Sequence, residues 1–194
     1  MYCRETDLRM ADAELLMIGY GNSLRTDDGI GPAVVQRLSD LLPSQYSGSV
    51  EMMTCLQLTP ELAAHIASFL RVVFIDASVA IPAGRILINR TECEESGAQL
   101  GHYFTPGMVL TMAASVFGSS PQAWTAAVGC RSMDIGDQLT PMAVAAVERL
   151  ARHLFECIAG LIDTGVFSPE MFEDSRDVAV GSDRLHHEGR MIYE

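Results

Sequence analysis

The stretch Leu15–Leu38, LLMIGYGNSLRTDDGIGPAVVQRL, decides the fold of this chain. It begins with an apolar run without alternation, which is typical of a strand covered on both faces. A turn with glycines follows, and apolar residues then recur at helical spacing from Ile30 onward. The stretch therefore predicts a strand–turn–helix unit with Asp27 and Asp28 beyond the carboxyl end of the strand. In open α/β sheets, ligands bind at this edge.

Strands and helices alternate along the rest of the chain. A threonine directly before a proline predicts a helix whose cap is the threonine and whose first residue is the proline. The sequence has this pair at Thr59, Thr105 and Thr140. The pattern predicts an α/β protein, a three-layer α/β/α sandwich around a mostly parallel, five-stranded sheet. We expect strands at 14–20, 50–55, 71–76, 85–89 and 124–130, and helices at 28–42, 60–69, 106–117 and 141–161.

Composition limits the functional classes. The 194 residues, 48% hydrophobic, suit one globular domain, and we expect a leader at 1–13, a single α/β domain at 14–163 and an appended tail at 164–194. The formal net charge of -12 argues against binding to nucleic acid or to an anionic membrane surface. No apolar run is long enough to cross a bilayer. The 5 scattered cysteines without a C-x-x-C pair predict free thiols and a cytoplasmic location.

The glycine-rich turn has two simpler interpretations. It opens like a dinucleotide-binding turn, but Leu24 stands where the third glycine belongs, and two carboxylates at a helix start would repel a pyrophosphate. We therefore expect no binding of a nicotinamide cofactor. A helix cap accounts for one carboxylate, and we assign that role to Asp27. Asp28 then remains available for chemistry.

Three side chains are predicted to meet at the carboxyl edge of the sheet. Asp28 follows the first strand, Asp76 ends the strand at 71–76, and His102 precedes the helix at 106–117. Each alone would be an ordinary turn carboxylate or a partly buried histidine, so the prediction depends on their convergence. Two carboxylates and one imidazole suit a divalent metal and leave coordination positions for a substrate. The sequence contains neither G-x-S-x-G nor H-E-x-x-H, so no serine-hydrolase elbow or helical zinc site is predicted.

The run from Gly19 to Leu38, with its paired glycines and the Asp27–Asp28–Gly29 triplet, resembles the opening of the hydrogenase maturation proteases. The resemblance continues to about Ile158. These endopeptidases remove the C-terminal extension from the large subunit of nickel–iron hydrogenases. The resemblance implies a peptidase domain at 14–163 and a hydrogenase large-subunit precursor as partner. The implied metal is nickel, supplied by the bound substrate.

The resemblance also implies roles for individual residues. Asp28, Asp76 and His102 match the three family positions that contact the metal and serve catalysis, although many relatives have a glutamate in place of Asp28. The water that cuts the peptide is activated either by the metal or by a carboxylate such as Asp76 acting as general base. The alternative is a non-catalytic, nickel-dependent assembly chaperone on the same fold. We expect a monomer or a weak dimer.

Overall fold

The computed structural model describes residues 14–46, 48–94 and 104–164. The predicted leader at 1–13, the predicted tail beyond Thr164 and the candidate ligand His102 lie outside the described residues. Those three assignments therefore stay predictions.

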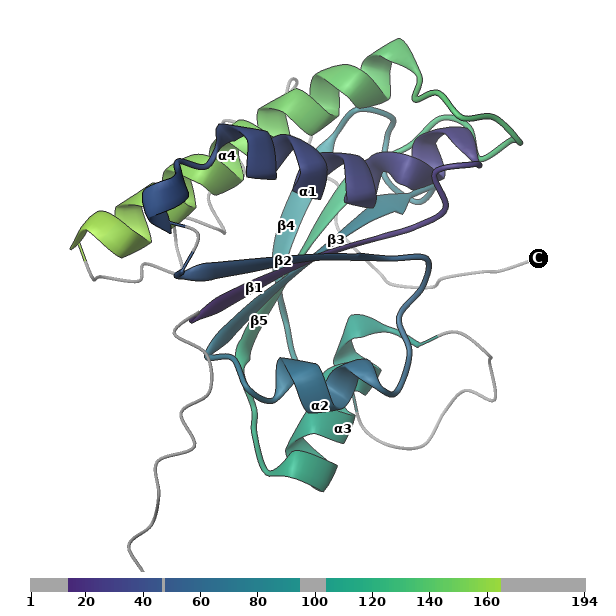
Figure 1. The fold of residues 1–194 in the computed structure, drawn as a ribbon. Helices are drawn as coiled ribbons and strands as arrows, with labels where there is room; N and C mark the ends of the chain where they lie inside the picture. The colour runs from purple at the N-terminus through teal and green to yellow at the C-terminus, as the bar shows by residue number, and fades with distance from the viewer. Residues whose placement is uncertain (1–13, 47, 95–103, 165–194) are drawn as a thin grey trace, which may run out of the picture.

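One sheet of five strands forms the centre of the molecule (Figure 1). Its strand order is β2-β1-β3-β5-β4, in which four strands run parallel and β4 pairs antiparallel to β5 at one edge. The predicted α/β class with a mostly parallel, five-stranded sheet is thereby confirmed. The strands are β1 Leu15–Tyr20, β2 Val50–Cys55, β3 Arg71–Ser78, β4 Ile86–Thr91 and β5 Gln122–Gly129.

Helices cover both faces of the sheet (Figure 1). Each face buries its own apolar cluster, one under α1 and α4 and the other under α2 and α3, so the three-layer sandwich is also as predicted. Among the described residues, no helix combines the length and apolarity needed to cross a membrane. The helices are α1 Ile30–Leu41, α2 Leu62–Ile66, α3 Pro106–Phe117 and α4 Pro141–Thr164, with short 3-10 turns η1 Thr26–Gly29 and η2 Ser44–Tyr46.

Two of the three predicted threonine caps are present. The Thr105 hydroxyl accepts a hydrogen bond from Met108 N–H at 3.2 Å, and the Thr140 hydroxyl accepts one from Ala143 N–H at 3.3 Å. The prediction for Thr59 is wrong, because α2 begins only at Leu62, whose N–H donates to the backbone carbonyl of Thr59. A turn of backbone hydrogen bonds thus separates this threonine from its helix.

Two glycines let α1 and the turn before it lie directly on the sheet. A Cβ atom on Gly31 would overlap the backbone carbonyl oxygens of Tyr20 and Ile75, so only glycine permits this approach of α1 to β1 and β3. Gly21 has a φ of +134°, and a Cβ atom there would overlap the carbonyl of Asp28. The close contact holds η1 at the carboxyl edge of the sheet.

Candidate active site

Asp76 is a half-buried carboxylate near the end of β3, the central strand of the sheet. Its Oδ1 accepts a hydrogen bond from the N–H of Ala77 at 2.7 Å, and the side chain of Tyr20 donates a second hydrogen bond. Burial raises the pKa of Asp76 to about 6, although both hydrogen bonds oppose the rise, and the nearby charge of Asp28 adds to it. The electrostatic interaction places the two carboxylates in the same neighbourhood.

Asp28 belongs to η1, which follows the carboxyl end of β1. Its Oδ2 accepts a hydrogen bond from the N–H of Asn22 at 3.1 Å. The side chain of Asn22 in turn accepts a hydrogen bond from Leu24 N–H at 3.0 Å, which closes the turn on itself. A backbone N–H group of the turn therefore holds the Asp28 carboxylate in place. The Asp28 residue itself is half-buried.

Asp27 does not cap α1, and that prediction is wrong. The N-cap of α1 is Gly29, without a side-chain cap, and the Asp27 side chain is only 1% exposed. It accepts hydrogen bonds from the N–H groups of Arg131, Ser132 and Thr140 at 3.0, 3.3 and 2.8 Å, and from the Thr140 hydroxyl at 3.1 Å. Burial alone would raise the pKa of Asp27, but these hydrogen bonds outweigh it and lower the pKa.

The loop between β5 and α4 is joined to the turn before α1 at further points. The N–H of Thr26 donates to the Gly136 carbonyl at 2.8 Å, and the N–H of Gly136 donates to the Leu24 carbonyl at 3.0 Å. The Thr26 hydroxyl donates to the Ser132 carbonyl at 2.8 Å. Thr26 has a φ of 43°, an uncommon conformation for a threonine, and these bonds hold it there. The turn and the loop thus behave as one structural unit beside Asp28.

The structure brings two of the three predicted site residues, Asp28 and Asp76, to one edge of the sheet. Within the described ranges, no three histidine, cysteine or acidic side chains gather closely enough to hold a metal. His102 lies outside those ranges, so its place beside the two carboxylates stays a prediction. Cys130 is a further neighbour that the sequence did not indicate. Burial raises the pKa of its thiol, and the charge of Asp27, followed by those of Asp28 and Asp76, contributes to the rise.

Sequence reasoning also missed Tyr20, whereas the bond of Asn22 to its own turn is of the kind that the sequence indicates. Tyr20 ends β1, and β1 lies beside β3, so its hydrogen bond to Asp76 could be found only once the strand order was known. Asn22 had a local signal, because asparagine in a glycine-rich turn commonly bonds nearby backbone. Its additional backbone contact with Asp28 was not foreseen.

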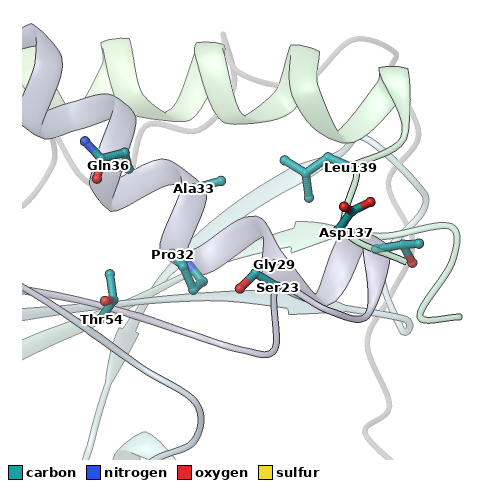
Figure 2. A pocket seen from close by; sticks show the side chains of 9 residues that line it. Ser23, Gly29, Pro32, Ala33, Gln36, Thr54, Asp137 and Leu139 are labelled. Carbon is teal, nitrogen blue, oxygen red and sulfur yellow. The ribbon is translucent and has the colours of Figure 1, made fainter. Parts of the chain in front are cut away.

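A cavity of about 350 Å³ opens beside the turn that carries Asp28, between α1, the end of β2 and the loop before α4 (Figure 2). Neither Asp28 nor Asp76 lines it, but Gly29 follows Asp28 directly in the chain. Hydroxyl, amide and small apolar groups dominate the lining, and Asp137 is its charged member. The lining residues are Ser23, Thr26, Gly29, Pro32, Ala33, Gln36, Thr54, Asp137 and Leu139.

No family model matches the chain. No curated protein sequence matches it either. Solved structures do resemble it. The NiFe hydrogenase maturation protease HycI of Thermococcus kodakarensis is 23% identical, with a TM-score of 0.61 over 74% of this chain and 91% of that one. The hydrogenase maturating endopeptidase HybD of E. coli is 24% identical, with a TM-score of 0.60 over 78% and 94%. The hydrogenase 2 maturation peptidase of a Thaumarchaeota archaeon is 23% identical, with a TM-score of 0.55 over 75% and 98%.

At these identities the likeness establishes a shared fold. It covers nearly the whole of each of the three neighbours, so the sandwich of this chain is a complete counterpart of theirs. The chemistry must be argued from the site itself. Two oriented carboxylates at the carboxyl edge of the sheet can bind a divalent cation or accept a proton from water.

Proposed function

We propose that this chain is an endopeptidase that removes the C-terminal extension of a nickel-loaded hydrogenase large-subunit precursor. The observation that carries the proposal is the pairing of Asp28 with Asp76 at the edge of a fold that the maturation proteases HycI and HybD share. The turn sequence from Gly19 to Leu38 supports it independently, since it contributes Asp28 and resembles the opening of that family.

The donor chemistry of the site fits a divalent ion that arrives with the substrate. Asp28 and Asp76 are half-buried carboxylates, and each accepts a hydrogen bond from a backbone N–H group of the chain itself. With His102 they would offer oxygen and nitrogen ligands of the kind that nickel accepts. When bound, such an ion polarises a carbonyl or lowers the pKa of a coordinated water.

The residues of the chain hold and orient the reacting groups. The Tyr20 hydroxyl and the N–H of Ala77 fix the Asp76 carboxylate, and the N–H of Asn22 fixes Asp28. Asp76 is our candidate for the general base that accepts a proton from the attacking water. A precursor without nickel would lack the contact that fixes its peptide at this edge, so the loaded precursor is the expected substrate.

The test compares nickel-loaded and nickel-free precursor after incubation with the purified chain, by intact mass. We expect the loaded precursor to lose its C-terminal peptide and the nickel-free precursor to keep it. A complex that forms without a change of mass would favour the assembly chaperone over the protease. Loss of the peptide from both precursors would contradict the role that we give to nickel.

The setting of the reaction is part of the same proposal. Cys55, Cys93, Cys130 and Cys157 form no disulfide within the described part of the chain, which suits a reducing compartment such as the cytoplasm. The partner is the precursor itself, bound by a monomer or weak dimer of this chain. The acidic net charge of -12 disfavours nucleic acid and anionic membranes as partners.

A further inference from the structure

Four large apolar side chains stand exposed on the loops around the candidate site. Each follows the carboxyl end of a different parallel strand: Leu24 after β1, Leu56 after β2, Val79 after β3 and Ile135 after β5. We call these four residues the apolar rim. Their exposed fractions are 67% for Leu24, 63% for Leu56, 74% for Val79 and 96% for Ile135.

The parallel strands bring the loops of the rim together at one end of the sheet (Figure 1). The N–H of Gly21 donates to the Cys55 carbonyl at 3.1 Å, next to Leu56. The N–H of Cys130 donates to the Ser78 carbonyl at 3.0 Å, next to Val79. Backbone hydrogen bonds of Gly136 join the loop of Ile135 to Leu24. The rim residues therefore stand on adjoining loops at the end of the sheet that carries Asp28 and Asp76.

The exposure of Ile135 is maintained by hydrogen bonds that hold its loop in place. The buried Asp27 carboxylate holds the Ile135 loop through the N–H groups of Arg131 and Ser132 and both donors of Thr140. A loop that is tied at this many points cannot fold over to cover its own apolar tip. Isolated exposed apolar residues are common, but four on adjoining loops at one end of the sheet mark an interaction surface.

The surface beside three of the rim residues is hollow. The cavity of Figure 2 is lined by Ser23, Thr54 and Asp137, each of which lies within two residues of a rim residue. Polar and apolar groups both line this concave surface, which can accept a chain segment while a larger partner covers the border.

We propose that the apolar rim docks the folded body of the protein substrate while its C-terminal extension lies against the two carboxylates. This inference rests on the proposed function, since a folded protein whose tail reaches the site necessarily covers the surrounding loops. The partner surface that it fits is an apolar patch around the base of that tail. Affinity for the precursor then comes from contacts distant from the scissile bond.

The test replaces rim residues by glutamine, one at a time, as Leu24→Gln, Leu56→Gln and Ile135→Gln. Leu70→Gln is the matched control, because Leu70 is 60% exposed but precedes β3 at the opposite end of the sheet. Initial rates on the nickel-loaded precursor give KM and kcat for each variant. Thermal unfolding midpoints establish that each variant is folded.

We expect each rim variant to raise KM by about 3- to 30-fold, with a smaller effect on kcat, and Leu70→Gln to match the wild type. Rim variants with wild-type KM would overturn the docking surface while leaving the proteolysis intact, and so would an equal rise of KM in Leu70→Gln. If the wild-type chain leaves the precursor uncut, the proposed function has failed, and dissociation constants of the complex replace KM in the same comparison. A chain that neither cuts nor binds the precursor overturns both.

Discussion

Asp27 and Asp28 are adjacent in the sequence but differ in burial and in hydrogen-bond partners in the structure. Asp27 is buried and receives four hydrogen bonds from the loop between β5 and α4. Asp28 is half-buried and is held by the turn that contains it. One carboxylate therefore assembles the site, and its neighbour is left at the edge of the sheet beside Asp76.

Removing the Asp27 carboxylate should cost stability. Asp27→Ala leaves the N–H groups of Arg131, Ser132 and Thr140 without their acceptor, and we expect the free energy of unfolding to fall by about 2–3 kcal/mol. Asp40→Ala is the control, because Asp40 is exposed in the last turn of α1 and accepts one side-chain hydrogen bond from Gln36. Urea unfolding of both variants at neutral pH measures the difference. Equal stability of the two would contradict the role assigned to Asp27.

For single residues, the sequence predicts only those neighbours that follow from the direction of the strands. Asp28 and Asp76 could be placed together because the carboxyl ends of parallel strands meet at one edge. The partners of Asp27 could not be predicted, because the N–H of Arg131 is 104 residues away and its approach depends on how β5 and α4 are connected. A short-range cap was the simplest local interpretation, and the tertiary contact replaced it.

At the scale of elements, local signals worked where a helix starts with its own side-chain cap. Thr105 and Thr140 cap α3 and α4 as predicted, and the strand at 50–55 has the predicted bounds. Thr59 failed because backbone hydrogen bonds within the preceding turn delay the start of α2. Hydrophobic pattern and turn residues thus gave the order and type of the elements, while their exact ends depended on contacts that the sequence does not display.

The contact between α1 and the sheet should tolerate no side chain at Gly31. Gly31→Ala drives a methyl group into the carbonyls of Tyr20 and Ile75, and we expect a loss of about 1–3 kcal/mol in the free energy of unfolding. The variant should also slow cleavage, because α1 carries η1 and Asp28 with it. Gly48→Ala is the matched control, since a Cβ atom there meets nothing within 4 Å. A Gly31→Ala variant as stable as Gly48→Ala would show that α1 is not held this closely.

An ion pair between α1 and α4 should make the free energy of unfolding depend on pH. Arg37 binds the Glu148 carboxylate with two hydrogen bonds, at 2.6 and 3.1 Å, and Arg152 adds a third at 2.8 Å. These bonds, those from Arg37 first, lower the pKa of Glu148 to about 2 from 4.5. A lowered carboxylate pKa stabilises the fold above pH 4.5, and this stabilisation is lost as the pH falls toward 2.

The stability difference between the wild type and Glu148→Gln should therefore shrink over that range. Because the pair is partly exposed, the difference should be small at neutral pH and should weaken further in high salt. Thermal unfolding midpoints of both proteins, measured from pH 7 to pH 2, give the result. A difference that grows as the pH falls would contradict the assignment.

At the scale of the whole molecule, the groups that the proposed function uses lie at one end of the sheet. The parallel order of β2, β1, β3 and β5 brings together the carboxylate pair, the cavity and the apolar rim. The fold class followed from the alternation of strands and helices, but the rim and the cavity did not, because both combine segments whose neighbours are set by strand order. The proposed function depends on the strand order that places these groups together.

The most direct test of the central claim is the rate at which the nickel-loaded precursor loses its C-terminal peptide. We expect Asp28→Asn and Asp76→Asn, each shown to be folded, to lower this rate by about 10²- to 10⁴-fold. Asp40→Asn, which changes an exposed carboxylate at the far end of α1, should cleave at the wild-type rate. Cleavage within tenfold of the wild type by either site variant would contradict the account.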